Sequence, residues 1–336
     1  MTHDHPAPPG PGAPRPFGSL LTAMVTPFTP DGSVDLDGAA VLATYLVDQQ
    51  GNDAIVVNGT TGESPTTTDA EKERLVRAVV EAVGDRAKII AGVGTNDTRH
   101  TIELAAAAEK AGADGLLVVT PYYSRPPQAG LDRHFRSVAD AAGLPILLYD
   151  VPGRAGIAIA SETLVRLAGH ERIVAVKDAK GDLAATSWVI SRTDLAYYCG
   201  DDALTLPTLA VGGVGLVGTS THLTGALTKQ LIEAYDRADI GTAQALHRRL
   251  LPLYIGIFRT QGTILVKAAM AALGLPAGPV RPPLIEATEA EIAQLRTDCA
   301  DAGLPLPTSD NEQPAAPTSD SEQAAAPTAA GDEEAA

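Results

Sequence analysis

Residues 88–119, which read KIIAGVGTNDTRHTIELAAAAEKAGADGLLVV, decide the fold. The stretch begins with a short apolar run at Lys88–Ala91 and ends with another at Gly115–Val119. Neither run alternates between apolar and polar residues, which is typical of strands in a parallel sheet covered on both faces. Between them, apolar side chains recur at helical spacing and predict a helix over Thr98–Lys110. The stretch therefore predicts a strand, a helix and a second, parallel strand.

The same alternation repeats along the chain. Eight apolar runs predict strands: Leu20–Val25, Ala54–Val57, Lys88–Ala91, Gly115–Val119, Ile146–Tyr149, Ile173–Val176, Leu195–Cys199 and Gly215–Val217. Helical stretches such as Asp69–Val83 lie between them. This pattern fits an α/β fold, the (β/α)8 TIM barrel, which usually has about 250 residues. We expect the barrel over residues 17–228 and additional C-terminal helices over residues 229–306, with a doubly wound open sheet as the alternative.

The two ends of the chain differ from this middle part. Residues 1–16 contain six prolines and almost no side chain that could join a core, so we expect a disordered arm. Residues 307–336 repeat with a period of ten, as PTSDNEQPAA, PTSDSEQAAA and PTAAGDEEAA, with seven acidic residues and no basic one. We expect a disordered acidic tail there. Its composition indicates no particular function.

Composition excludes several classes of protein. The 41 acidic and 25 basic residues give a net charge of −16, which disfavours binding to nucleic acids or to anionic membranes. No apolar run reaches the roughly 18–20 residues of a membrane-spanning helix, and residues 1–16 do not resemble a signal peptide. Two cysteines, Cys199 and Cys299, are too few for a disulfide framework or a cysteine metal site. We expect a cytoplasmic protein without a metal.

Candidate functional residues follow the predicted strands. After Ala54–Val57 comes GTTGES at Gly59–Ser64, where backbone N–H groups and the hydroxyls of Thr60 and Thr61 could bind a carboxylate. A tight turn with a Ser/Thr helix cap fits the same residues. Lys177 directly follows the sixth run, at a strand end where its amine could attack a carbonyl. A lysine at a strand end can equally be a solvated surface residue.

Aromatic and basic residues follow two neighbouring runs. The segment YDVPGRAG begins with Tyr149, a possible proton carrier, and contains Arg154, which could bind a carboxylate with two parallel hydrogen bonds. A packed tyrosine and a surface arginine are the simpler interpretation. The segment PYYSRP presents Tyr122 and Tyr123 on a proline-rich loop, where a contact between subunits is also possible.

These motifs, with VKDAKGD at 176–182 and GDD at 200–202, occur in the order found in the dihydrodipicolinate synthase family of pyruvate-dependent class I aldolases, which the chain resembles from Phe17 to about Leu304. The resemblance implies that Lys177 forms a Schiff base with pyruvate and that no cofactor is needed. It also implies that Thr60 and Thr61 bind the pyruvate carboxylate. The carbonyls of Gly200 and Val217 would line the pyruvate pocket.

The resemblance implies a second substrate, L-aspartate 4-semialdehyde, whose carboxylate Arg154 would bind. Tyr149 would pass protons through Thr61 to Tyr123, which reaches the site from the neighbouring subunit of a homotetramer, a dimer of dimers. The implied product is 4-hydroxy-tetrahydrodipicolinate, on the diaminopimelate route to lysine. Two alternatives are other pyruvate aldolases, of the N-acetylneuraminate lyase or 2-keto-3-deoxy-sugar-acid aldolase type, and a non-catalytic keto-acid-binding protein.

The sequence departs from the family at several positions. Asp150 replaces an asparagine and Ala155 a threonine, and both replacements leave Tyr149 and Arg154 in place. Asp69, Lys72 and His100 stand where lysine-sensitive members have two histidines and a glutamate, so we expect weak or absent inhibition by lysine. GVGLVG at 213–218 matches a dinucleotide-binding pattern, but no clean strand–helix–strand unit follows. We therefore interpret it as the final barrel strand, narrow enough to let a ligand and a helix approach closely.

Overall fold

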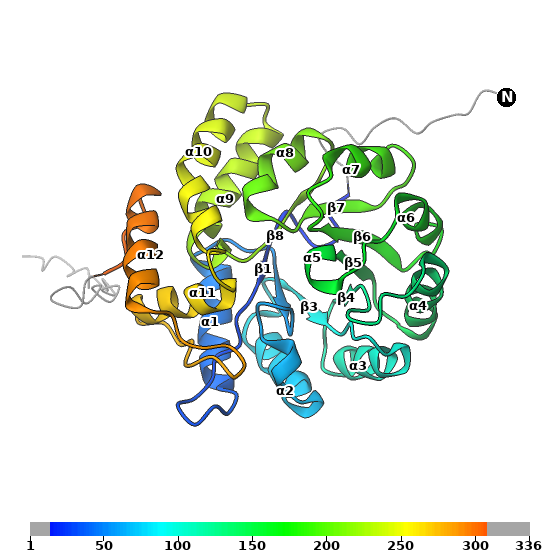
Figure 1. The fold of residues 1–336 in the computed structure, drawn as a ribbon, viewed down its shortest axis with the longest axis horizontal. Coiled ribbons are helices and arrows are strands. Elements are labelled where there is room, and N and C mark those ends of the chain that lie inside the picture. The colour runs from blue at the N-terminus through cyan, green and yellow to red at the C-terminus, as the bar shows by residue number, and fades with distance from the viewer. Residues whose placement is uncertain (1–13, 308–336) are drawn as a thin grey trace, which may run out of the picture. The chain divides into compact units, whose positions relative to one another are not determined.

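The computed structural model describes residues 14–307, and within them eight parallel strands close into a barrel (Figure 1). The strands are β1 (Leu20–Ala23), β2 (Ala54–Val57), β3 (Lys88–Gly92), β4 (Gly115–Val119), β5 (Ile146–Asp150), β6 (Ile173–Asp178), β7 (Ala196–Cys199) and β8 (Gly215–Gly218). Because β8 pairs with β1, the sheet is closed. The predicted (β/α)8 barrel is thus confirmed, and the alternative of an open sheet is wrong.

A helix follows each strand, and most of the helices cover the outside of the barrel. They are α1 (Leu36–Asp48), α2 (Asp69–Val83), α3 (Thr98–Lys110), α4 (Gln128–Ala141), α5 (Pro152–Ala155), α6 (Ser161–Leu167), α7 (Leu183–Ile190), α8 (Thr205–Ala210), α9 (Thr221–Asp236), α10 (Ile240–Gly256), α11 (Gly262–Ala272) and α12 (Glu289–Asp301). Two short 3-10 helices, η1 (Ser64–Thr66) and η2 (Asp202–Leu204), lie in the loops after β2 and β7.

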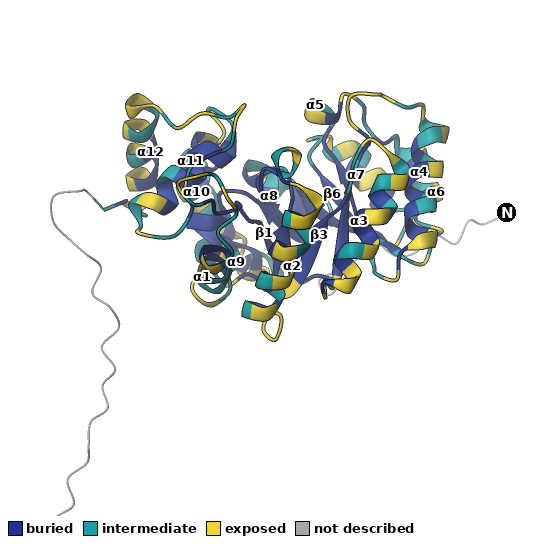
Figure 2. Ribbon diagram, turned by 90° about the horizontal axis from the view of Figure 1, so that it is seen from below, coloured by how far each residue is buried: buried dark blue, intermediate teal, exposed yellow. Residues whose placement is uncertain are grey.

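The local sequence explains where the helices begin. The Thr68 side chain accepts from the N–H of Glu71 while the Glu71 carboxylate accepts from the N–H of Thr68, a capping box that starts α2. Asp97 accepts from the N–H of Arg99 and starts α3. The strands are almost entirely buried, as their dark blue colour in Figure 2 shows, and exposed residues gather on the outer helices. This is the burial expected for a parallel sheet covered on both faces.

Additional helices follow the eighth strand. Helix α9 packs on β1 and α10, and α10 packs on α12, so these helices lie together on one side of the barrel in Figure 1. The boundary expected between residues 228 and 229 falls inside α9. The predicted arm and tail lie outside the described residues, except for residues 14–16 and 307. Among these few residues, Arg15 forms an ion pair with Asp236, at 2.6 Å between guanidinium and carboxylate.

The glycine-rich segment 213–218 forms the last barrel strand. A Cβ atom on Gly215 would lie 2.0 Å from the Ser19 carbonyl oxygen, so the close approach of β8 to β1 requires glycine there. No helix among residues 14–307 is long and apolar enough to cross a membrane.

Candidate active site

A cavity of about 400 Å³ opens at the carboxyl ends of the barrel strands. This is the end of a TIM barrel that carries active sites. Six of the predicted site residues line the cavity together: Thr60, Thr61, Tyr149, Arg154, Lys177 and Gly200. The structure therefore brings together side chains from the ends of β2, β5 and β6 and backbone from the end of β7.

Lys177 and Tyr149 lie side by side on neighbouring strands. Their Cα atoms are partners in the pairing of β5 with β6, and Lys177 Nζ lies 4.3 Å from the centroid of the Tyr149 ring. The lysine is only 5% exposed. The parallel register thus holds a buried amine against the face of a phenol in the lining of the cavity.

The loop after β2 is shaped to leave two amide groups available. The N–H groups of Thr60 and Thr61 have no hydrogen-bond partner among residues 14–307, so they are free to bind an anion. Asn58 and Glu63, on either side of them, have φ angles of 60° and 57°. Residues other than glycine rarely adopt this left-handed backbone conformation, so contacts elsewhere must stabilise the loop.

The Glu63 side chain provides such contacts. One carboxylate oxygen lies 2.7 Å from Lys267 Nζ, and the other accepts the N–H of Arg281 at 2.8 Å. Lys267 also donates to the Pro279 carbonyl at 2.6 Å. Burial lowers the pKa of Lys267, while Glu63 opposes this change. The C-terminal helices thus hold the threonine loop through one buried ion pair.

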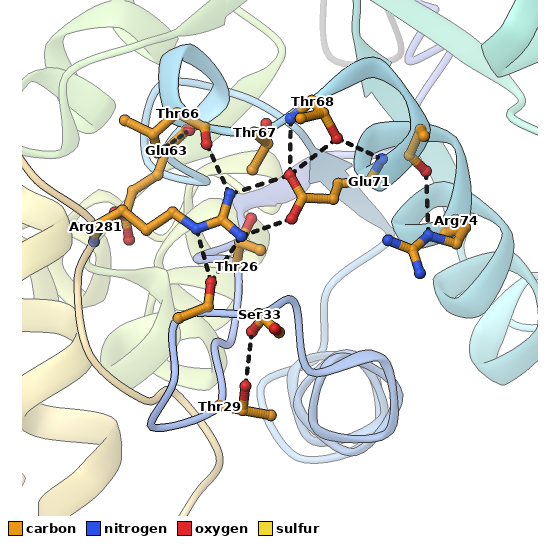
Figure 3. A network of polar contacts seen from close by, with 12 residues as sticks. Thr26, Thr29, Ser33, Glu63, Thr66, Thr67, Thr68, Glu71, Arg74 and Arg281 are labelled. Atoms are coloured by element: carbon orange, nitrogen blue, oxygen red, sulfur yellow. Dashed lines mark hydrogen bonds and ion pairs between the residues drawn. The ribbon is translucent and has the colours of Figure 1, made fainter.

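The Arg281 side chain extends the same support to α2 (Figure 3). Its Nη2 lies 2.6 Å from the Glu71 carboxylate, and its guanidinium donates to the carbonyls of Thr66 and Gly32, each at 2.7 Å. The guanidinium also stacks 4.3 Å from the Phe28 ring centroid. Hydrogen bonding to Arg281 lowers the pKa of Glu71 to about 2. Arg281 therefore joins three loops around the mouth of the barrel.

Arg154 is available to a ligand. It lies in α5 (Pro152–Ala155), which is followed by the cap residue Gly156 with a left-handed φ of 80°. Its side chain is exposed at the cavity and forms no ion pair with a carboxylate among residues 14–307. A guanidinium in this state can bind the carboxylate of an incoming substrate.

Asp150 and Asp178 end neighbouring strands and share one lysine. Lys180 Nζ lies 3.0 Å from an Asp150 oxygen and 3.8 Å from an Asp178 oxygen. The Ile159 N–H donates to both Asp150 oxygens at 3.2 Å. Burial raises the pKa of Asp150, although Lys180 opposes the rise. These contacts tie the segment that carries Arg154 to β6, so the aspartate at position 150 is part of the framework of the site.

Two predicted site residues do not line the cavity. Val217 is buried within β8. Tyr123 is 90% exposed, on backbone with a φ of 70°. Its neighbour Tyr122 lines a second cavity of about 280 Å³, which shares Thr60 and Tyr149 with the first. The role of Tyr123 requires a second subunit and stays a prediction.

Several cavity residues were absent from the sequence-based prediction. Thr219, directly after β8, lines the cavity. So do residues of α10, of α11 and of the segment between them, including Tyr254, Phe258 and Thr263. The polar pair at 219–220 directly follows an apolar strand. The same signal identified other site residues and could have identified Thr219. The residues of α10 and α11 have no comparable local signal.

Lys177 is the one lysine among the described residues that line this cavity. Among residues 14–307, no three His, Cys, Asp or Glu side chains come together as metal ligands would. Cys199 and Cys299 are buried free thiols, and burial raises the pKa of each to about 12. Neither thiol is therefore poised to react as a thiolate.

Comparisons with known proteins extend this description. Residues 16–302 match the sequence model of the Dihydrodipicolinate synthetase family. A relative from Acidothermus cellulolyticus, 4-hydroxy-tetrahydrodipicolinate synthase, is 70% identical over 290 residues, which are 86% of this chain and 94% of the relative. The solved structure of DHDPS from Cyanidioschyzon merolae with lysine bound is 43% identical, with a TM-score of 0.83 over 87% of this chain and 100% of that one. The chloride-inhibited dihydrodipicolinate synthase from Acinetobacter baumannii, complexed with pyruvate, is 34% identical, with a TM-score of 0.82 over 86% of this chain and 99% of that one.

Proposed function

The chain belongs to the dihydrodipicolinate synthetase family and has the lyase activity of a 4-hydroxy-tetrahydrodipicolinate synthase, and we propose that Lys177 carries this activity as the Schiff-base lysine. The observation that carries the proposal is the lining of one cavity by Lys177, Tyr149, Thr60, Thr61 and Arg154. Together they supply a nucleophile, a proton carrier and two sites for carboxylates.

The first half of the reaction uses pyruvate. Its carboxylate binds the N–H and hydroxyl groups of Thr60 and Thr61, which presents the keto carbon to the Lys177 amine. The amine attacks that carbon, and water leaves as the imine forms. The protonated imine attracts electrons from the methyl group, so Tyr149 and Thr61 can carry a methyl proton away and leave an enamine. The protein-bound imine accepts these electrons, so no cofactor is required.

The second half uses L-aspartate 4-semialdehyde. Arg154 binds its carboxylate, and the enamine carbon attacks the aldehyde carbon while the relay returns a proton to the new hydroxyl. The amine of the semialdehyde then attacks the imine carbon and displaces Lys177, which closes the ring. The product is 4-hydroxy-tetrahydrodipicolinate, and the one water released came from imine formation.

In this proposal the active form is a homotetramer, built as a dimer of dimers. The support is Tyr123, which is 90% exposed on backbone with a φ of 70°. It directly follows Tyr122, which lines a cavity that shares Tyr149 with the active site. The reaction is proposed to occur in the cytoplasm, in agreement with the two buried free thiols.

Borohydride trapping tests this function. The full chain is incubated with pyruvate and reduced, and the modified peptide is mapped by mass spectrometry. We expect one adduct on Lys177, no adduct in Lys177→Ala, and turnover of L-aspartate 4-semialdehyde by the unmodified protein. Absence of the adduct would refute the proposal. An adduct without turnover of the semialdehyde would favour a sugar-acid aldolase instead.

A further inference from the structure

The Asp150 side chain closes the segment that carries Arg154. Asp150 ends β5, and α5, which contains Arg154, follows in the chain. Nine positions after Asp150, the N–H of Ile159 donates to both oxygens of the Asp150 carboxylate, each at 3.2 Å. The chain between them therefore leaves the barrel at Asp150 and returns to the same side chain. One carboxylate holds the two ends of the Arg154 segment together.

Lys180 supplies the positive charge beside this carboxylate. Its Nζ lies 3.0 Å from an Asp150 oxygen, and the Asp150 side chain is fully buried. The backbone N–H of Lys180 donates to Asp178 at 2.8 Å, which fixes the lysine at the end of β6. A buried carboxylate is costly unless it is paired and hydrogen-bonded. Lys180 is thus the partner that lets position 150 hold an ionised carboxylate.

A second side chain holds the return of the same segment. Gln128 of α4 donates to the carbonyl of Ala158 and accepts the N–H of Ala160, each at 2.9 Å. Ile159 lies between these two residues and is held by Asp150. Side chains from β5 and α4 therefore fix the stretch 158–160, where the segment rejoins the body of the barrel.

Lys177 and Tyr149 are fixed in a different way. Their Cα atoms are partners in the pairing of β5 with β6, so the ladder of backbone hydrogen bonds holds them. The Arg154 segment lies outside that ladder, because β5 ends at Asp150. Loss of the Asp150 carboxylate should therefore disturb Arg154 much more than Lys177.

We propose that Asp150 and Lys180 are positioning residues for the second substrate: their ion pair closes the Arg154 segment and sets where the guanidinium stands at the cavity. Neither residue contacts a reacting atom. This inference rests on the proposed function, because it assumes that Arg154 binds the carboxylate of L-aspartate 4-semialdehyde. The pair then affects the second half of the reaction and leaves the first half unchanged.

The test changes the charge of the pair. In Asp150→Asn the amide keeps one oxygen, for which the Ile159 N–H and the Lys180 ammonium compete. Its NH2 group is a donor that neither of them can accept, so the segment should loosen. In Asp150→Asn/Lys180→Met the competing ammonium is gone. The amide oxygen can then accept the Ile159 N–H, and the segment should close again.

Each full-length protein is assayed with both substrates, because the kcat/KM for each substrate reports the half-reaction in which it binds. In Asp150→Asn we expect the kcat/KM for L-aspartate 4-semialdehyde to fall roughly tenfold, since a displaced guanidinium meets the substrate poorly. The kcat/KM for pyruvate and the borohydride-trapped adduct should stay within about twofold of the wild type. Asp150→Asn/Lys180→Met should recover most of the loss.

Asp53→Asn is the matched control. Asp53 also accepts backbone N–H groups, from Ser19 and Leu20, and it forms an ion pair with Lys229. It directly precedes β2, at the end of the barrel opposite the cavity. Its replacement should lower stability, and any loss of folded protein should reduce the kcat/KM for both substrates equally.

A further variant shows whether Asp150 acts through Arg154. When Asp150→Asn is added to Arg154→Ala, the kcat/KM for the semialdehyde should fall no further. If Asp150→Asn does not fold, Gln128→Met releases the same stretch and should give the same selective loss.

Four results would overturn the inference: an unchanged kcat/KM for the semialdehyde in Asp150→Asn, equal losses for both substrates, no recovery in Asp150→Asn/Lys180→Met, or a further loss on top of Arg154→Ala. The absence of a selective loss in Gln128→Met would overturn it where that variant is used. Failure of the proposed function is distinct, because it would appear as a wild-type protein without an adduct at Lys177 or without turnover of the semialdehyde.

Discussion

The ammonium group of Lys267 lies 2.7 Å from the carboxylate of Glu63, and both side chains are almost completely buried. Glu63 belongs to the loop that carries Thr60 and Thr61, whereas Lys267 belongs to α11. The C-terminal helices therefore contribute directly to the pyruvate-binding part of the proposed site. Removal of one partner from such a pair leaves an unpaired buried charge, which usually costs about 3–5 kcal/mol.

Lys267→Met should therefore lower the Tm by roughly 5–10 °C and raise the KM for pyruvate, because Glu63 would no longer hold the threonine loop in its left-handed conformation. Thermal unfolding and initial rates measure the two effects. The control is the double variant Glu63→Gln/Lys267→Met, which has no unpaired charge and should recover most of the Tm. A single variant as stable as the wild type would show that the pair adds nothing to the fold.

The Arg281–Glu71 ion pair makes the free energy of unfolding depend on pH in the acidic range. The pKa of Glu71 is lowered from 4.5 to about 2, so the pair stabilises the folded state fully above pH 4.5, and this contribution is lost as the pH falls towards 2. Glu71→Gln should reduce the free energy of unfolding by about 2–3 kcal/mol at pH 7 and by progressively less below pH 4.5. Urea unfolding at several pH values measures the difference.

Glu73→Gln is the matched control for Glu71→Gln. Glu73 lies on the same helix in an exposed ion pair with Arg77, and such pairs contribute less than about 1 kcal/mol. Its effect should be small at every pH. If Glu71→Gln destabilises the protein equally at pH 7 and pH 3, the effect comes from lost packing rather than from the charge of Glu71.

The sequence predicted the parts of the molecule that local pattern determines. Strands β2 and β4 and helices α2 and α3 have the predicted bounds, because apolar periodicity and helix caps are local properties. Lys177 was found as a polar side chain at the end of an apolar run. Lys267 left no such signal, since a lysine within a helix is ordinarily solvated, and only the tertiary fold brings it to Glu63. Contacts between residues so distant in sequence depend on how helices pack, which periodicity does not specify.

Arg154→Ala should separate the two substrates. Because the Arg154 side chain has no carboxylate partner within residues 14–307, its removal leaves no buried group unpaired, and the fold should be unaffected. We expect the kcat/KM for L-aspartate 4-semialdehyde to fall by about a hundredfold, as a charge-assisted bidentate contact is lost, while the borohydride-trapped pyruvate adduct stays near the wild-type level. Arg166→Ala, an exposed arginine away from the cavity, is the control. Equal loss of adduct and turnover would contradict the assignment of Arg154 to the second substrate.

Tyr123 can be tested by mixing inactive variants. If its hydroxyl acts in a neighbouring subunit, Tyr123→Phe and Lys177→Ala should each be nearly inactive, yet mixed dimers would contain one complete site. Subunits exchanged at a 1:1 ratio should then recover about a quarter of the wild-type activity, because half of the dimers are mixed and each has one good site. Activity is measured after unfolding and refolding the mixture, with each variant refolded alone as control. Mixtures that stay inactive would place Tyr123 outside the neighbouring site.

Inhibition by lysine should be weak or absent. Three polar residues occupy the positions at which the resemblance implies a lysine site: Asp69 and His100 bind each other, with Nε2 2.9 Å from the carboxylate, and Lys72 donates to the Thr67 carbonyl. The ammonium of Lys72 would repel the ammonium groups of a lysine ligand. Initial rates at low millimolar lysine should therefore match those without it, whereas the variant Asp69→His/Lys72→His/His100→Glu should gain inhibition. Glycine at equal concentration controls for general effects of an amino acid. Strong inhibition of the wild-type protein, or no gain in the triple variant, would mean that residues other than these three determine the response.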